Sequence, residues 1–465
     1  MPLRSMLSRV SRIGSELRQL VTLALPLSLA QLAHSGMGFV DTLFVGRLGP
    51  SALAGLALGS TVYFTIFNVL MAVLLAVAPL VAQAVGAGRN REPGRVAGQA
   101  LLLALGLAVP GAVLFLSAEP ILLLAGLPES SVTLAGAYLR AITPGLPFAL
   151  GFVALRGMLE GHGDARPILI MALAGVGLNV FLNDMLIFGR YGLPPFGVTG
   201  VGLTTAAVYT LMFAGATWLV RRKYREQAVF AHMLRFDPER LREILRVGWP
   251  ISAMLGLEVS AFSVTTFVLG GFGDAVLAGH QIAMQSSSMA FMIPLGIATA
   301  TGVLVGQAAG RRDPHGVRRA GSMGIALAAL FMCLTALLFW LAPRVVIGLF
   351  VDLDSPGNLA LVQHATTFLA IAAMFQIVDG MQVTAQGALR GLKDTRVPML
   401  LTLVAYWCVG IASGLLLTFV AGVGPRGMWF GLVAGLGVAA LLLVVRFSRL
   451  SGRTPSGRWR ERPVV

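Results

Sequence analysis

The chain has 465 residues, of which 56% are hydrophobic and only 12% are charged. Since a soluble domain is about one quarter charged, this composition excludes a soluble globular protein. The net charge of +15 could suit a nucleic-acid-binding protein, but such a protein gathers its charge on one face of a domain. Here the basic residues stand between apolar segments, so we expect no nucleic-acid partner.

Twelve apolar segments follow one another along the chain, each long enough to cross ~30 Å of hydrocarbon. They are too long and too uniformly apolar for the strands of a membrane barrel. We therefore predict an all-α integral membrane protein. The predicted spans are 20–46, 52–84, 96–118, 132–156, 167–189, 197–220, 245–270, 276–308, 320–343, 360–388, 398–420 and 426–447.

The basic residues between these spans predict the orientation of the chain. The chain has 35 Lys and Arg residues. If the N-terminus is cytoplasmic, only five of them fall on the outer side of the membrane: Arg47, Arg140, Arg190, Arg344 and Arg426. Cytoplasmic connections of membrane proteins carry an excess of Lys and Arg. We therefore expect both termini to be cytoplasmic.

The two halves of the sequence repeat each other. At an offset of 224 residues, Pro26 falls on Pro250, and Gly49 falls on Gly273. Each repeat holds six spans, so both enter the membrane in the same orientation, and we expect two six-helix lobes related by a pseudo-twofold axis along the membrane normal. The predicted parts are an N-terminal lobe (1–220), a cytoplasmic linker (221–244), a C-terminal lobe (245–450) and a basic cytoplasmic tail (451–465).

Two parallel lobes favour transport by alternating access, in which the lobes rock about a site between them. A channel is more often a symmetric oligomer with a filter segment, and the sequence has no filter-like run.

Acidic residues lie inside predicted spans, and Asp41, Glu258 and Asp379 are the principal candidates. An ionisable group at membrane depth costs at least ~2.5 kcal/mol and usually marks a functional site. Facing one cavity, Glu258 and Asp379 could bind Na+ through hard oxygen ligands or could share protons. The alternative is a structural pair satisfied by hydroxyls and amides.

Asp41 has polar candidates for neighbours in the fifth span, namely Asn179, Asn183 and Asp184. These residues could serve cation coupling, or they could form a polar network that packs two helices together. His34 aligns with Glu258 in the internal repeat and could titrate near neutral pH. A neutral histidine, hydrogen-bonded within the bundle, is the commoner case.

Other side chains within the spans are candidates for a substrate cavity. Methionine adapts to irregular ligands, and uncharged polar groups at depth can bond to a substrate or to a neighbouring helix. The alternative for each is ordinary packing. The candidates are Gln31, Asn68, Met284, Gln285, Met289, Phe291, Met292 and Gln382.

Three stretches carry a resemblance to a known family. They are "LALPLSLAQLAHSGMGFVDTLFVGRLGPSALAGLALG" (23–59), "GLNVFLNDMLIFG" (177–189) and "FQIVDGMQVTAQGALRGLKDTRVPM" (375–399). Together they resemble the NorM-like branch of the multidrug and toxic compound extrusion (MATE) transporters, over essentially residues 15–450.

The resemblance implies an antiporter of the bacterial inner membrane, which exports organic, often cationic compounds as Na+ or H+ enters. It implies that Glu258 and Asp379 form the cation site of the second lobe and that Asp41 is the functional aspartate of the first helix. We expect no cofactor, a monomer, and small organic cations and lipid as partners.

Two other functions compete with this interpretation. A lipid-linked oligosaccharide flippase of the same superfamily needs a cavity lined by cationic groups, but no Lys or Arg lies deep in any predicted span. An integral membrane enzyme needs a nucleophile beside a base or a metal site. The sequence shows no such grouping, so we expect a transporter and not an enzyme.

Overall fold

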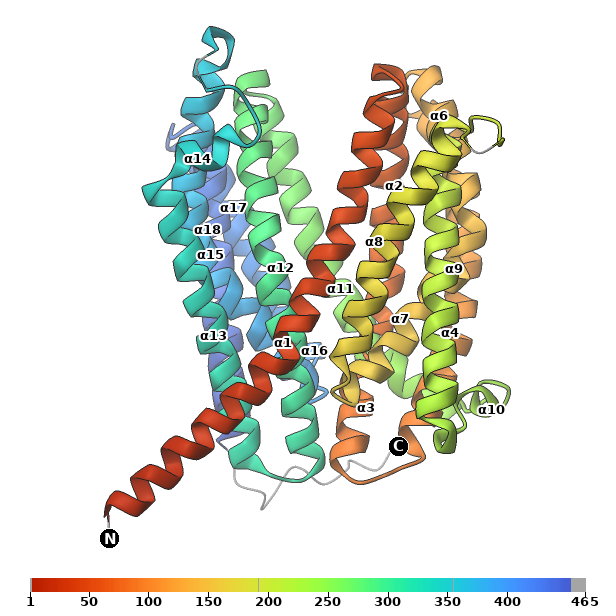
Figure 1. The fold of residues 1–465 in the computed structure, drawn as a ribbon. Helices are drawn as coiled ribbons and strands as arrows, with labels where there is room; N and C mark the ends of the chain where they lie inside the picture. Colours follow the sequence, from red (N-terminus) through yellow and green to blue (C-terminus); the bar gives the residue numbers. More distant parts are fainter. Residues whose placement is uncertain (1, 191, 354, 453–465) are drawn as a thin grey trace. The chain divides into compact units, whose positions relative to one another are not determined.

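The computed structural model describes residues 2–190, 192–353 and 355–452, with only the backbone described for 2–13. All regular elements in this part of the chain are helices (Figure 1). Twelve helical segments among the described residues are long and apolar enough to cross a membrane, which confirms the predicted fold class. Most of the basic tail predicted at 451–465 lies outside the described residues.

The first repeat contains both single and broken spans. The second span is divided into α2 and α3, the third into α4 and α5, and the fourth into α6 and α7 by the 3-10 turn η1, which contains Pro144. Proline removes a backbone donor and favours such a break. The elements are α1 (Pro2–Gly46), α2 (Pro50–Leu74), α3 (Val77–Gly86), α4 (Glu92–Leu116), α5 (Ala118–Leu124), α6 (Glu129–Ile142), η1 (Thr143–Gly145), α7 (Leu146–Gly161), α8 (Ala165–Phe188) and α9 (Val198–Lys223).

A short linker leads into the second repeat, whose eleventh span contains two π-helical stretches, η4 and η5. The elements are η2 (Arg225–Gln227), α10 (Val229–Met233), α11 (Pro238–Gly270), α12 (Asp274–Gly310), α13 (Pro314–Leu341), α14 (Pro343–Gly348), η3 (Pro356–Asn358), α15 (Leu359–Gly391), α16 (Arg396–Leu403), η4 (Val404–Ile411), α17 (Ala412–Leu415), η5 (Leu416–Val420) and α18 (Arg426–Ser451).

The internal repeat is visible in the backbone. Gly49 and Gly273 both precede the second helix of their repeat, with φ of 108° and 101°. Side chains other than hydrogen are strained at such angles, so both turns require glycine. The repeated glycines are therefore explained by the turn that each one makes.

The described helices form two compact units that do not coincide with the two repeats. The N-terminal unit is Leu29–Ser252, and the C-terminal unit is the chain up to Ser28 together with the chain from Ala253 onward. The opening stretch of each repeat's first helix thus belongs to the unit built mainly from the other repeat.

A matching pair of hydrogen bonds accompanies this exchange. Within the C-terminal unit, the hydroxyl of Ser28 donates to the carbonyl of Ile293 at 2.9 Å. Within the N-terminal unit, the hydroxyl of Ser252 donates to the carbonyl of Val69 at 2.7 Å. Both donors and both acceptors are related by the repeat offset of 224. Gly296 lies so close to Ser28 that a Cβ there would collide with it, so small residues allow the contact.

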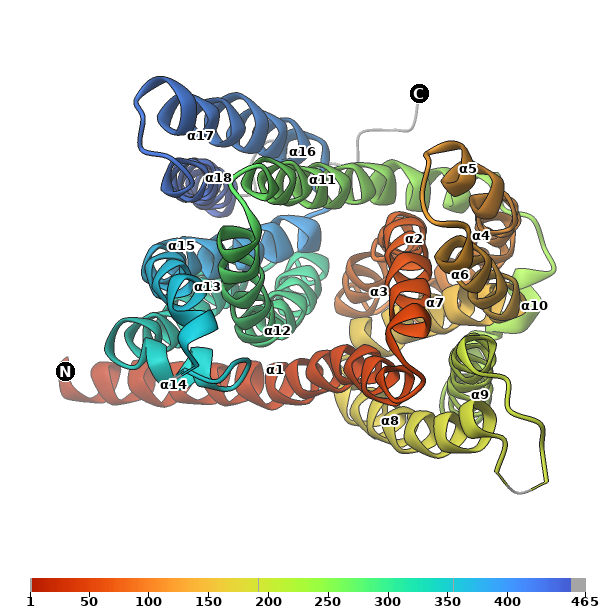
Figure 2. The same cartoon turned by 90° about the horizontal axis from the view of Figure 1, so that it is seen from above.

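The core of the C-terminal unit lies among α12, α13, α15 and α18, which stand side by side in Figure 2. Trp429 of α18 is fully buried and stacks on Phe368 and Phe375 of α15, with ring centroids 5.4 and 5.7 Å apart. This aromatic packing holds α15, which carries Asp379, in place.

Several helices extend beyond the predicted spans, including the two that carry Arg156 and Arg390. The predicted spans 132–156 and 360–388 continue to Gly161 and Gly391. Arg156 and Arg390 therefore lie inside helices, Arg156 five residues before the end of α7 and Arg390 one residue before the end of α15.

Candidate functional site

Asp41 of α1 is held by two asparagines of α8 in the N-terminal unit. Its Oδ1 accepts hydrogen bonds from Asn179 Nδ2 at 3.0 Å and from Asn183 Nδ2 at 2.7 Å. The asparagines are four residues apart, on one face of the helix, and are 1% and 0% exposed. Asp184 instead forms an ion pair with Arg190 at 3.1 Å. The structure thus brings two of the three predicted neighbours to Asp41.

Three buried tyrosines lie within electrostatic range of this carboxylate. They are Tyr63 of α2, Tyr138 of α6 and Tyr209 of α9. Tyr63 also stacks on Phe67, with ring centroids 5.3 Å apart. Hydropathy does not distinguish these tyrosines from the other residues of the spans. One signal could have found them, because the chain has only six tyrosines and half of them gather here.

His34 and Gln31 have partners inside the N-terminal unit. His34 Nε2 lies 3.1 Å from the hydroxyl of Tyr209, which is the hydrogen-bonded arrangement considered as the alternative. Gln31 Oε1 accepts from Arg156 at 2.8 Å, and Arg156 also donates to Glu160 at 2.7 Å. Gln31 therefore fixes a partly buried guanidinium. Asn68 is partly buried on α2.

Glu258 of α11 and Asp379 of α15 lie close enough in the C-terminal unit for their charges to interact. Asp379 is only 7% exposed, and its Oδ1 has no hydrogen-bond partner in the described part of the chain. Tyr406 of η4 is within electrostatic range of both carboxylates. The guanidinium of Arg390 attracts Glu258. The two predicted acids thus lie within electrostatic range of each other, and Arg390 lies within range of Glu258.

A polar stripe runs along α15 from Asp379 toward the end of the helix. Gln382 and Gln386 follow Asp379 on one face and are 1% and 3% exposed. Arg390 donates to Gln386 Oε1 at 3.0 Å, whereas both amide atoms of Gln382 lack a partner among the described residues. Buried polar atoms are rarely left unpaired, least of all in a membrane helix. Gln382 is therefore suited to bind an ion or water beside Asp379.

The cavity candidates on α12 do not form one buried cluster. Met284 packs against the core of the C-terminal unit. Gln285 and Met289 are exposed, and Phe291 and Met292 are partly buried. Packing therefore accounts for Met284, while Gln285 and Met289 lie on an exposed helix face.

Across the described residues, no three His, Cys, Asp or Glu side chains gather closely enough to hold a metal ion. A Na+ ion at Glu258 and Asp379 would have two carboxylates and would need neutral oxygen ligands as well. Gln382 Oε1 is a suitable ligand, because hard cations prefer oxygen atoms.

Comparison with known proteins shows relatives along nearly the whole chain. The MatE family model matches residues 26–185 and 250–416, and the two segments begin at the repeated prolines. The chain is 43% identical over 444 residues to the probable multidrug resistance protein NorM of Deinococcus radiodurans, with 96% of this chain and 97% of that protein covered. It is 40% identical over 435 residues to the protein of the same name in Burkholderia mallei, with 92% of each covered.

Solved structures share the fold at lower sequence identity. A crystal structure of MATE in complex with MaD3S has a TM-score of 0.85 and 23% identity, and it covers 94% of this chain and 97% of that one. The eukaryotic MATE transporter AtDTX14 has a TM-score of 0.82 and 19% identity, covering 94% and 98%. At these identities the likeness concerns the fold alone.

Proposed function

Because the chain belongs to the MATE family, we propose that it is a secondary transporter, not an enzyme, which exports organic, often cationic compounds in exchange for Na+ or H+. The relatives at about 40% identity are named multidrug resistance proteins, which supports this substrate class. The twelve apolar helices make the chain a multi-pass membrane protein. We place it in the bacterial inner membrane as a monomer, with both termini cytoplasmic.

The pair of Glu258 and Asp379 is the observation that carries the coupling part of the proposal. Two neighbouring carboxylates inside the membrane repel each other, and a bound Na+ or a proton removes that repulsion. Among the described residues, Asp379 retains an oxygen without a hydrogen-bond partner, so it can accept a cation without breaking an existing bond. The amide of Gln382, which has no partner in the same part of the chain, can complete the coordination.

Asp41 supplies a second anionic group for the transported compound. Its carboxylate attracts organic cations, and the surrounding tyrosine rings favour cationic groups through their π faces. An exchanger must make drug binding and ion binding mutually unfavourable, and this coupling is reciprocal. Neutralising a carboxylate by H+ or Na+ lowers its attraction for a cationic drug, which couples the two fluxes, and the ion gradient sets the direction of exchange.

We propose that the two repeats support alternating access, with exchange of the bound species between the two sides of the membrane. The duplicated six-span arrangement supports this mechanism. No ATP is required, since the ion gradient supplies the free energy.

Transport by purified protein in proteoliposomes tests the proposal. We expect an imposed Na+ gradient, a pH gradient, or both to drive movement of a fluorescent organic cation such as ethidium, while protein-free vesicles show none. Imposing the two gradients separately identifies the coupling ion. If neither gradient moves the dye, and a neutral substrate also stays in place, the proposed exchange is wrong.

A further inference from the structure

The linker between α9 and α11 is fixed to α4 by a single buried side chain. Gln99 of α4 is 1% exposed. Its amide nitrogen donates to the carbonyls of His232 at 2.8 Å and Arg235 at 2.6 Å, and its Oε1 accepts from the backbone N–H of Asp237 at 3.1 Å. Three hydrogen bonds from one residue give the linker a defined shape.

Two glycines of α4 allow the linker to approach this closely. A Cβ at Gly94 would collide with the carbonyl oxygen of Gln227, and a Cβ at Gly98 would lie 2.6 Å from the carbonyl oxygen of Val229. Four residues apart, these glycines form one groove along the helix, where backbone meets backbone. At the repeat offset, positions 318 and 322 are Arg and Ser, so the groove belongs to the first repeat alone.

The fixed linker brings basic side chains around a cavity of about 230 Å³. Arg95, Arg235 and His232 line it, with Asp237 as its acidic member. Burial lowers the pKa of His232 below the usual 6.5. The guanidiniums of Arg95, Arg235 and Arg91 lower this pKa further, and Asp237 acts in the opposite direction. These guanidiniums thus concentrate positive potential at one place.

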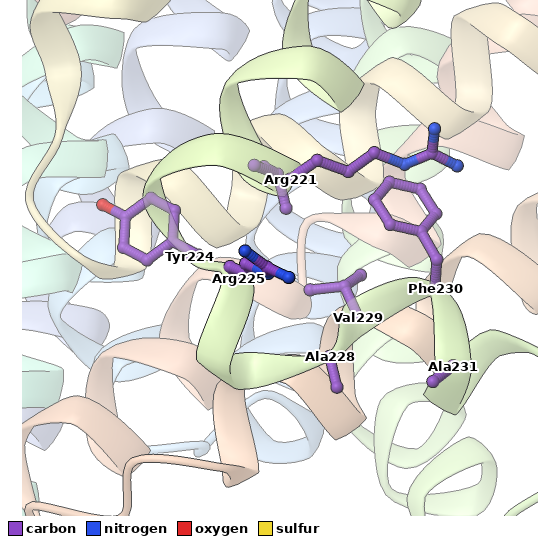
Figure 3. Close-up of a pocket in the computed structure, with 8 residues that line it drawn as sticks. Arg221, Tyr224, Arg225, Ala228, Val229, Phe230 and Ala231 are labelled. Carbon is purple, nitrogen blue, oxygen red and sulfur yellow. The ribbon is translucent and has the colours of Figure 1, made fainter.

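No ion pair neutralises Arg95 or Arg235 within the described residues, in contrast to Arg240, which contacts both Glu92 and Glu243. Arg221 lies over the ring of Phe230 of α10, 4.6 Å from its centroid, beside a second cavity that Arg225 also lines (Figure 3). Arginines therefore line both cavities next to α10.

Exposed apolar side chains accompany these charges. Leu234 and Phe236 in the linker are 86% and 68% exposed, and Trp218 of α9 and Trp249 of α11 are 60% and 63% exposed. Arg95 lies in the first turn of the span Glu92–Leu124. Arg95 and the linker next to it therefore lie at a membrane boundary, where aromatic and basic residues typically gather.

We propose that the cavity between Arg95 and Arg235 binds the phosphate of an anionic phospholipid headgroup, while Leu234 and Phe236 enter the interfacial region of the bilayer. Charge complementarity selects this occupant, because guanidiniums bind phosphate through paired N–H donors. Juxtamembrane basic residues are also attracted by anionic lipids. The apolar neighbours favour a lipid over a soluble phosphate. This proposal is independent of the transport function.

Binding of phosphatidylglycerol to the purified full chain in a neutral detergent tests the site. We expect phosphatidylglycerol to bind and phosphatidylcholine to bind far more weakly. Arg95→Gln with Arg235→Gln should raise Kd for phosphatidylglycerol roughly 25-fold, at about fivefold for each arginine. The matched control, Arg311→Gln with Arg318→Gln, removes two exposed arginines from the corresponding connection of the second repeat and should change Kd less than twofold.

Two further measurements distinguish a lipid site from a site for a soluble anion and from non-specific attraction. Glycerol phosphate should not compete at concentrations where phosphatidylglycerol saturates, and equal competition would show a site for a soluble anion, which overturns the lipid assignment. Gly98→Val keeps every charge but displaces the linker. Provided that the variant remains monodisperse, it should also bind phosphatidylglycerol more weakly. Equal losses in the Arg95/Arg235 and Arg311/Arg318 variants, or equal binding of both lipids, would show that no specific site exists.

Discussion

Replacing Asp41 by asparagine removes one negative charge from the N-terminal unit while nearly keeping the shape of the side chain. The amide oxygen of the substituted side chain can still accept from Asn179 and Asn183, which bond to Asp41 Oδ1 at 3.0 and 2.7 Å. The fold around the site should therefore persist. The change isolates the electrostatic attraction between this position and a cationic substrate.

The expected loss of binding free energy for a cationic substrate follows from the burial of the site. A cation about 4 Å from a carboxylate gains about 1 kcal/mol in bulk water and about 4 kcal/mol at the effective dielectric of a protein boundary. Because Asn179 and Asn183 beside Asp41 are only 1% and 0% exposed, the attraction between Asp41 and a cation should be nearer to about 4 kcal/mol than to about 1 kcal/mol. Since about 1.4 kcal/mol is a factor of ten, Asp41→Asn should weaken binding of an organic cation at least about tenfold. A neutral substrate should lose much less.

Equilibrium binding of ethidium and of one neutral substrate, measured over a range of pH and Na+ concentration, is the assay. Asp184→Asn is the matched control, because it removes the same charge from a neighbouring residue whose carboxylate pairs with Arg190. We expect only Asp41→Asn to weaken ethidium binding and to reduce its dependence on the ions. If both variants behave alike, or if Asp41→Asn changes neither quantity, Asp41 only packs α1 against α8.

Three further predictions concern coupling, topology and pH. Glu258→Gln and Asp379→Asn should each abolish gradient-driven efflux at normal protein abundance, and normal transport in both variants would rule out the coupling pair. In a cysteine-free background, a single cysteine at position 230 should resist an impermeant label added from outside, whereas one at 355 should react; the reverse result would contradict the topology. Burial lowers the pKa of His162 below the usual 6.5, with Lys223 adding to this effect and the Met158 carbonyl and Asp164 opposing it; the unfolded state therefore binds the proton more readily, and local stability should fall as pH drops below about 6.5. His162 Nε2 lies 2.8 Å from Gln227 Nε2 in the linker between α9 and α11. Amide exchange in this linker, compared between about pH 7.5 and 5.5, should show the loss of stability in the native chain and a flatter response in His162→Gln.

Hydropathy and the internal repeat were sufficient to predict the helices and the candidate acids. Spans of ~20 apolar residues have one stable form in a bilayer, and charge inside a span is costly enough to be conspicuous. Asn179 and Asn183 could be paired with Asp41 because the sequence places all three in spans. Gly49 and Gly273 occur at equivalent positions of the repeat for one physical reason, because each lies in a turn with positive φ.

Contacts that depend on packing between distant segments were not predictable. Gln99 looks like one more polar residue in a span, and only the approach of the linker to Gly94 and Gly98 gives it three bonds. Arg156 stands at the very end of the predicted span 132–156, whereas its bonds to Gln31 and Glu160 allow it to lie within α7. Helix ends set by such pairings leave no mark in hydropathy.

The serine contacts bear on the origin and the assembly of the chain. Neither repeat contains all the helical segments of one unit, because each contributes the opening stretch of its first helix to the other. Two identical ancestral copies that exchanged this stretch would each gain the bond that Ser28 or Ser252 now makes, which is the geometry of a domain-swapped dimer. In the fused chain, Ser28 is synthesised 265 residues before its acceptor Ile293. The opening stretch of the first helix can therefore make this contact only after the eighth span has been synthesised. An isolated N-terminal half would lack the acceptor carbonyl of Ile293.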